Sequence, residues 1–285
     1  PALIEASGVV ASRRHDGVLW AHNDSGGAGG IHGFNLAGDD LGFFGLGPAD
    51  ARIPVTDVED IALFEDRIYL ADIGDNLRQR SAVAIHVFDE PAPGGGGDLT
   101  DVTTIQARYP DGPSDAEALL VDPVTGGLLI MSKDLDDRDA PTRLYALPPQ
   151  PATATAGGEP VTMELVGSLD VAALSRRSSA FSVNGLLFPG SVTAADVFDD
   201  GSLIAVRTYG SVWLFARPPG QTLAQALASE PCEGGAAAET QGEAVGFLPD
   251  DGSDASPRSI RYVTVSEGPN PPINVVTVEI GAASD

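Results

Sequence analysis

Four residues able to bind a hard metal ion occur at one equivalent position of a repeated sequence pattern. They are Ser7, Glu59, Glu117 and Glu243. The pattern has a further copy, in which the neutral Ala195 takes this position and Asp196 follows it. If the fold brings these positions together, their oxygen atoms suit Ca²⁺, which accepts oxygen ligands in irregular geometry.

Each copy of the pattern reads as two short strands joined by a turn. The clearest copy runs over residues 115–134, where Asp115 and Glu117 stand at i and i+2 of the first strand and therefore share one face. The copies recur at intervals of roughly 50 to 80 residues, a period typical of four-stranded propeller blades. Five copies predict an all-β fold, a five-bladed β-propeller with a central channel and blades of three to four antiparallel strands.

A propeller of this size is expected to take up residues 1–285 as a single domain. The predicted blades cover approximately residues 5–50, 57–110, 115–170, 193–228 and 241–282. An insertion over 171–191 explains the long interval before blade four, and it either covers one face of the ring or packs on its side. Residues 222–228 favour a short helix over a fourth strand. Blade five lacks an outer strand, so the residues before Glu5 complete it or it stays three-stranded.

Carboxylates converging on a channel need a counter-charge. The first strand of each propeller blade lines the channel, and carboxylates facing one another there repel by several kcal/mol per pair at an effective dielectric constant of about 20. We expect one Ca²⁺ in the central channel, held by Ser7, Glu59, Glu117 and Glu243. The alternative is that these side chains bind backbone amides and water at the channel mouth, with some of them protonated.

Short motifs around these residues resemble those of a known family. Glu5-Ala6-Ser7-Gly8, Glu59-Asp60, Ala116-Glu117-Ala118 and Gly242-Glu243-Ala244 are similar to inner-strand motifs of the five-bladed calcium-activated nucleotidases, or apyrases. More loosely they resemble phytase-like and SdiA-regulated propellers. The resemblance implies that Ser and Glu from successive blades hold one central Ca²⁺. Ala195 departs from the pattern, and Thr193 or a backbone carbonyl could supply the missing ligand.

A second set of residues is expected on the same face of the ring. Antiparallel pairing places the end of every second strand beside the start of every first strand, which gathers His22, Asp24, Asp72, Lys133 and Arg207. Lys133 and Arg207 would hold a phosphate or sugar acid, or else only balance the neighbouring acids. His22 is the candidate general base, and the two aspartates would position substrate and water.

These residues suggest a Ca²⁺-dependent hydrolase of phosphoesters or related anionic small molecules. The alternative is a non-catalytic propeller in which the ion is structural and a ligand or a partner protein binds the rim or the insertion. A lactonase-like enzyme is a third reading, which the five-fold repeat disfavours because that activity is associated with six-bladed propellers.

Composition excludes several partners. The chain has 41 acidic and 16 basic residues and a net charge of −25, so it would repel nucleic acids and anionic membranes. No apolar run approaches the roughly 18 residues of a membrane span. A lone Cys232 cannot form an intramolecular disulfide. We expect the protein to be a monomer. We expect it to be secreted or periplasmic after removal of a signal peptide. Its acidic composition is explained either by salt adaptation or by a GC-rich genome.

Overall fold

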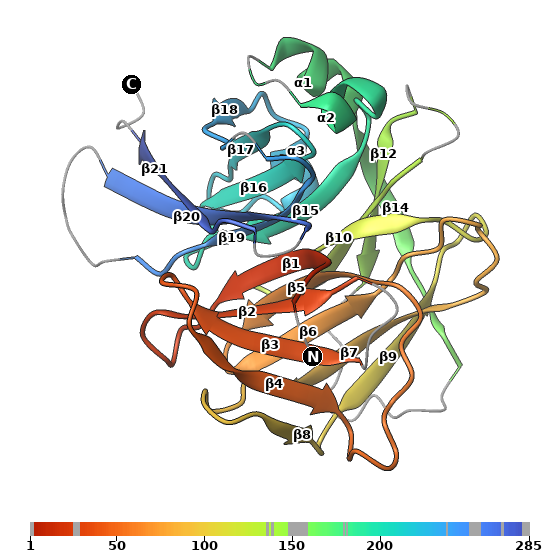
Figure 1. The fold of residues 1–285 in the computed structure, drawn as a ribbon. Coiled ribbons are helices and arrows are strands. Elements are labelled where there is room, and N and C mark those ends of the chain that lie inside the picture. Colours follow the sequence, from red (N-terminus) through yellow and green to blue (C-terminus); the bar gives the residue numbers. More distant parts are fainter. Residues whose placement is uncertain are drawn as a thin grey trace.

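The computed structural model describes residues 3–24, 29–134, 137, 140–147, 159–178, 180, 182–237, 239–250, 258–268 and 271–280. They form a five-bladed β-propeller, which confirms the predicted fold class. Five small, mostly antiparallel sheets stand around one axis, and each presents its first strand to it (Figure 1). These inner strands are β1 (Ala6–Ala11), β5 (Val58–Phe64), β10 (Ala116–Val121), β15 (Val192–Val197) and β19 (Gly242–Phe247). Each packs beside the next, and β19 packs beside β1, which closes the ring.

Blades one and two each receive an extra strand from the chain of the following blade. Blade one continues with β2 (Val18–Asn23), β3 (Gly30–Asn35) and β4 (Asp40–Leu46), and blade two with β6 (Arg67–Asp72), β7 (Val83–Asp89) and β9 (Thr103–Arg108). The short strand β8 (Gly97–Leu99) pairs in parallel with β4, and β13 (Val161–Thr162) pairs in parallel with β9. These additions tie neighbouring blades together at the outside of the ring.

Blades three and four have four strands each. Blade three continues with β11 (Leu128–Ser132), β12 (Thr142–Leu147) and β14 (Glu164–Leu169), and blade four with β16 (Leu203–Thr208), β17 (Val212–Ala216) and β18 (Cys232–Gly234). The predicted helix is present as α3 (Leu223–Leu227), which begins at a capping box formed by Thr222 and Gln225. The fourth strand of this blade is β18, which follows the helix and was not assigned from the sequence. A three-residue strand is too short to show an alternating apolar pattern.

Blade five has three strands in the part of the chain that the structure describes. They are β19, β20 (Arg258–Ser266) and β21 (Asn274–Ile280). Residues 3–5 form no strand, and their contact with this blade includes a hydrogen bond of 3.0 Å from the N–H of Gly268 to the carbonyl of Ile4. Of the two predicted alternatives, the described residues therefore show the three-stranded blade.

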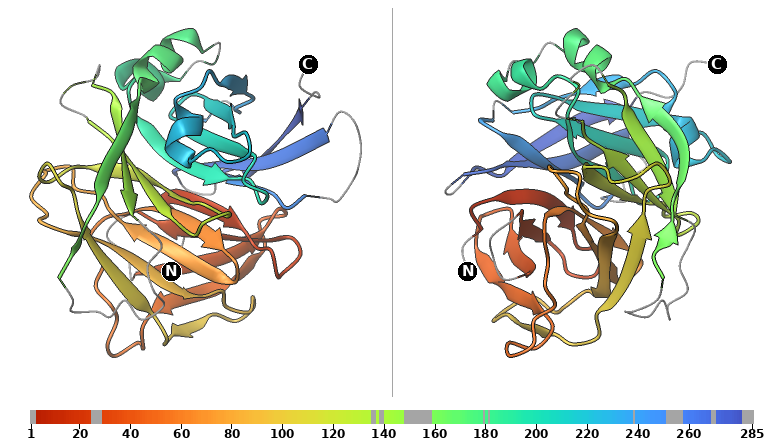
Figure 2. Two further views of the ribbon diagram at one scale, coloured as in Figure 1. Left: turned by 180° about the vertical axis from the view of Figure 1, so that it is seen from behind. Right: turned by 90° about the vertical axis from the view of Figure 1, so that its right-hand side faces the viewer.

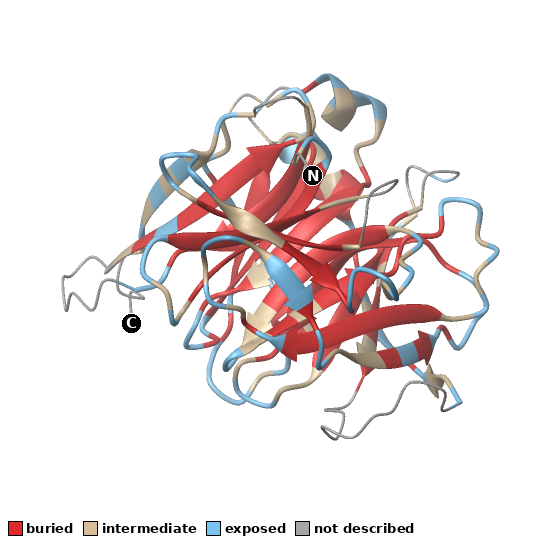
Figure 3. Ribbon diagram, turned by 60° about the horizontal axis from the view of Figure 1, so that its bottom comes forward, coloured by how far each residue is buried: buried red, intermediate tan, exposed pale blue. Residues whose placement is uncertain are grey.

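The core is divided among the five junctions between neighbouring blades. Five apolar clusters are present, and each joins residues of two adjacent sheets. Trp20 lies in the cluster between blades one and two, and Trp213 in the cluster between blades three and four. Both are at most 2% exposed, as expected for core residues. Burial is concentrated along the strands, whereas exposed residues collect in the connecting loops (Figure 3). Packing on both faces of each sheet holds the inner strands in register.

The insertion over 171–191 contains two short helices, α1 (Val171–Arg177) and α2 (Val183–Leu187), which lie at one end of the molecule (Figure 2). Val171 and Leu174 of α1 pack into the cluster between blades three and four, on the side of the ring. Asn184 of α2 reaches Gln241, directly before β19, at 3.5 Å. The insertion thus packs on the side and touches the edge of the face on which the inner strands begin. None of the described helices is long and apolar enough to cross a membrane.

Candidate metal centre

Every inner strand has a β-bulge at its second residue. The pairing with the neighbouring strand shifts by one residue there, so one residue of each inner strand has no directly paired residue on its neighbour. These unpaired residues are Ser7, Glu59, Glu117, Thr193 and Glu243. A bulge re-aims a side chain, and bulges are frequent next to functional sites. Because the inner strands run in the same direction around the ring, the five bulges place equivalent residues at one end of it.

The bulges correct the alignment of blade four. The sequence repeat placed Ala195 at the equivalent position, whereas the strand pairing places Thr193 there, two residues earlier. Ala195 pairs directly with Val206 further along β15. The prediction was wrong because Thr193-Ala194-Ala195 is a run of small residues, with no carboxylate to show which of them is equivalent to the glutamates of the other blades. Only the hydrogen-bond register shows which residue is left unpaired.

The two hydroxyl residues at bulge positions connect neighbouring blades. Oγ of Ser7 donates a hydrogen bond of 3.0 Å to the carbonyl of Glu59, and Oγ1 of Thr193 donates one of 3.0 Å to the carbonyl of Gly242. Ser7 was predicted to be a metal ligand. The structure places Ser7 on the inner strand of blade one, where its hydroxyl donates a hydrogen bond to the backbone of blade two. Its role as a metal ligand stays a prediction.

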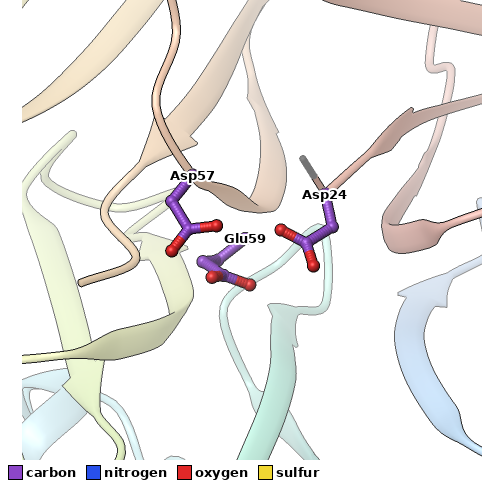
Figure 4. Close-up of side chains that lie close together, drawn as sticks. All are labelled: Asp24, Asp57 and Glu59. Atoms are coloured by element: carbon purple, nitrogen blue, oxygen red, sulfur yellow. The ribbon is translucent and has the colours of Figure 1, made fainter. Parts of the chain in front are cut away.

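Asp24, Asp57 and Glu59 form the first acidic group. Their carboxylates come from blades one and two and face a common space (Figure 4). One oxygen of each lies within 4.8 Å of one oxygen of each other. Asp24 follows β2 and is linked to β5 by a hydrogen bond of 3.1 Å from the N–H of Val58 to its carbonyl. Asp24 and Asp57 are half-buried and Glu59 is 3% exposed, so the group opens toward solvent on one side.

Asp72 holds the backbone next to this group in place through hydrogen bonds. Its carboxylate accepts hydrogen bonds of 3.0 Å from the N–H groups of Thr56 and Asp57, and Arg80 lies 2.8 Å from it. Burial alone would raise the pKa of Asp72, but the nearby His86, whose Nε2 lies 3.9 Å away, the N–H of Asp57 and the charge of Arg80 outweigh it and lower the pKa. The structure therefore places Asp72 as a buried, ion-paired residue that fixes the segment carrying Asp57.

Gly74 packs directly against the first group. A Cβ atom at this position would collide with Oε1 of Glu59 and lie 2.6 Å from Cγ of Asp57. The absence of a side chain at Gly74 is therefore a condition for the approach of these two carboxylates.

Glu59, Asp115 and Glu117 form a second acidic group that shares Glu59 with the first. One oxygen of each again lies within 4.8 Å of the others, and all three residues are buried. Lys133 neutralises part of this charge, with its Nζ 2.5 Å from Oε1 of Glu117 and 3.2 Å from the hydroxyl of Tyr209. Among the ion pairs between described residues, none involves Asp24, Asp57 or Glu59.

Three of these carboxylates, those of Asp24, Glu59 and Asp115, have raised pKa values. Burial, followed by the charge of Asp57, raises the pKa of Asp24 to about 8. Burial, followed by the charge of Glu117, raises the pKa of Asp115 to about 7 and also raises the pKa of Glu59. Oδ1 of Asp24 and Oδ2 of Asp115 are buried and have no hydrogen-bond partner among the described residues. Buried carboxylate oxygens of this kind are suitable ligands for a hard cation.

Glu243 lies at the same end of the ring but outside both groups. Its Oε1 accepts a hydrogen bond of 2.8 Å from Gln241, and its Oε2 is buried and has no partner in the described part of the chain. Burial, followed by the charge of Glu117, raises the pKa of Glu243 to about 8. Of the four predicted metal ligands, the structure thus brings Glu59 and Glu117 into shared groups and keeps Ser7 and Glu243 beside them.

His22, the predicted general base, lies inside blade one. It is 1% exposed and packs against the backbone of Gly8, where a Cβ atom would be 2.7 Å from its Nε2. Nε2 has no partner among the described residues. Burial lowers the pKa of His22 to about 4, so its imidazole is uncharged at neutral pH. The structure therefore places the predicted general base in a buried position.

Arg207, predicted to hold an anion, is fully buried between blades four and five. Its guanidinium lies 2.5 Å from Oε2 of Glu239 and fills the space left by Gly242. Burial lowers its pKa, although the charge of Glu239 opposes this. Its placement is that of an internal ion pair. Lys133 is therefore the one predicted cationic residue that the structure brings to the acidic groups.

Asp57 and Asp115 were missed as candidate ligands. The sequence signal was present, because each stands two residues before a glutamate and two such residues share one face of a strand. The contact of Tyr209 with Lys133 depends on the approach of blades three and four, which the sequence does not show.

Comparisons with known proteins assign no activity. No family model and no curated protein matches the chain. A solved structure of hydrazine synthase from Kuenenia stuttgartiensis aligns with a TM-score of 0.45 and 9% sequence identity, covering 100% of this chain and 97% of that chain. Similarity at this level carries no functional argument, and the predicted resemblance to apyrases stays an expectation.

Proposed function

We propose that this propeller binds one divalent cation, Ca²⁺, at Asp24, Asp57 and Glu59. The observation that supports it is the close approach of three carboxylates that share no ion pair with any described residue. Carboxylates at such distances repel strongly in a partly buried site, and a cation removes this repulsion. Glu59 strengthens this argument, because it is 3% exposed and takes part in none of the ion pairs between described residues.

The donor set favours Ca²⁺ over other common ions. All three side chains offer hard oxygen atoms, and no sulfur or imidazole nitrogen belongs to the group. Ca²⁺ tolerates irregular geometry, whereas Mg²⁺ requires near-ideal octahedral coordination. Ligands contributed by two separate blades suit the more tolerant ion, and the half-exposed Asp24 and Asp57 leave room for water. When bound, the ion would link blades one and two and present positive charge to solvent.

Hydrolysis of phosphoesters stays a prediction. It needs groups that hold an anion, yet Arg207 is buried against Glu239 and Lys133 is bound to Glu117. The proposal therefore concerns cation binding and includes no catalytic step. Release of inorganic phosphate from nucleotides, abolished by EDTA, would extend the proposal to an enzyme.

The test is a titration of the metal-free protein with Ca²⁺ by calorimetry. We expect one ion per chain for the wild type and no measurable binding for Asp57→Asn, which keeps the shape of the side chain and removes its charge. Asp89→Asn is the matched control, because its side chain is 82% exposed at the far end of blade two. A wild type that binds no Ca²⁺, or an Asp57→Asn variant that binds like the wild type, would overturn the proposal.

A further inference from the structure

We infer that Lys133 limits the acidic centre to one divalent cation, because its ammonium pairs with Glu117, one of the three carboxylates of a second candidate cation site formed by Glu59, Asp115 and Glu117. The inference rests on the proposed function, since it concerns the number of ions at the same centre. It assigns Lys133 the role of a built-in counter-ion in place of the anion-binding role expected from the sequence.

The second group has the features of a metal site. Its three carboxylates are each at most 4% exposed, and their oxygens approach within 4.8 Å. Asp115 is held by a hydrogen bond of 2.8 Å from the N–H of Asp75 to its Oδ1, while its Oδ2 has no partner among the described residues. The group therefore combines a fixed geometry with an unused buried oxygen, as a ligand set for a hard cation requires.

Lys133 is fixed in this group from both ends. Its backbone N–H donates a hydrogen bond of 3.0 Å to the carbonyl of Asp115. Its Nζ contacts Glu117 and the hydroxyl of Tyr209, and it lies 5.4 Å from the centre of the Tyr209 ring. The residue is 6% exposed. A compact ammonium on a flexible stem is the side chain most similar to a small cation, and here it is held without freedom to leave.

The two groups differ in their counter-charge. Lys133 brings one positive charge to the second group through its ion pair with Glu117. The first group has no such partner among the described residues. Because Glu59 belongs to both groups, an ion in the second group would share it with an ion in the first. Removal of the ammonium should therefore open a second site adjacent to the first.

Lys133→Met tests this directly, because methionine is apolar and of similar length. The metal-free wild type and variant are dialysed against Ca²⁺, and bound calcium is measured by mass spectrometry. We expect one ion in the wild type and two in Lys133→Met. The control Arg67→Gln removes one positive charge at the start of β6, at the opposite end of that strand from Asp72, and should bind one ion.

The outcomes separate the inference from the proposed function. One ion, or none, in Lys133→Met beside one ion in the wild type overturns the inference and leaves the proposed function intact. No ion in the wild type overturns the proposed function itself.

A second variant keeps the inference testable if Lys133→Met does not fold. Asp115→Asn in the otherwise unchanged protein removes a ligand of the second group only. We expect it to bind one Ca²⁺ with an affinity within about threefold of the wild type. Loss of binding in Asp115→Asn would show that both groups form one site, and it would overturn the inference.

Discussion

Nζ of Lys133 lies 2.5 Å from Oε1 of Glu117, and less than a tenth of either side chain is exposed. A buried pair of this kind contributes little net stability, but removing one partner leaves an uncompensated charge. This asymmetry makes Lys133 a sensitive probe of the acidic centre.

Lys133→Met should lower the free energy of unfolding by about 3–5 kcal/mol in EDTA, because Glu117 then lacks its counter-charge. Added Ca²⁺ should restore a large part of the loss. Urea denaturation with and without Ca²⁺ measures both effects. Arg67→Gln, which affects a partly exposed ion pair of 3.6 Å, should change stability by less than about 1 kcal/mol. Equal losses in the two variants would contradict the assignment.

The stability of the metal-free protein should decrease as the pH rises. The pKa values of Asp24 and Glu243 are raised to about 8 in the folded chain. Unfolded carboxyl groups titrate near about pH 4. The folded state thus holds these protons more tightly, so their contribution is complete below about pH 4 and is lost as the pH rises to about 8.

Melting temperatures in EDTA, measured between about pH 5 and about pH 8, check this prediction. Asp24→Asn removes one of the titrating groups and should show a weaker dependence on pH. In saturating Ca²⁺ the decrease should shrink or reverse, because the ion binds the ionised carboxylates. A melting temperature in EDTA that rises over this range would refute the proposed protonation.

Asp60 should be a major determinant of stability. It is fully buried, and its carboxylate accepts hydrogen bonds of 2.9 Å from the N–H of Ile61, 2.9 Å from that of Leu119 and 3.3 Å from that of Ala195. One side chain therefore joins blades two, three and four. Asp60→Ala leaves these N–H groups unpaired and should reduce the free energy of unfolding by about 3 kcal/mol or more.

Asp60→Asn keeps one acceptor oxygen and should fall between the wild type and Asp60→Ala. Urea denaturation orders the three proteins. An alanine variant as stable as the wild type would mean that water or a backbone shift replaces the carboxylate.

Gly74→Ala should weaken Ca²⁺ binding without removing any ligand. The added methyl group collides with Glu59 and Asp57, so the two carboxylates must move apart. We expect at least about a tenfold loss of affinity by calorimetry, equivalent to 1.4 kcal/mol. Gly97→Ala is the control, since its Cβ would lie 3.9 Å from the nearest side chain. Unchanged affinity in Gly74→Ala would place the ion away from Glu59.

The sequence by itself determined the number of blades and the position of the acidic face. Hairpins follow from local alternation of apolar and polar residues, and a five-fold repeat of hairpins leaves few folds other than a propeller. The two-residue spacing of Asp57 from Glu59 and of Asp115 from Glu117 is likewise visible in the sequence, whereas the bulge at each glutamate is not.

The tertiary structure alone decided which charges are compensated. Arg207 lies near the end of β16 and Lys133 directly after β11, yet Arg207 is buried against Glu239 and Lys133 reaches Glu117. Thr193 replaced Ala195 because hydrogen-bond register, and not residue type, defines equivalence. These outcomes depend on contacts between blades that are far apart in the chain, and no local pattern of residues records how closely two blades approach.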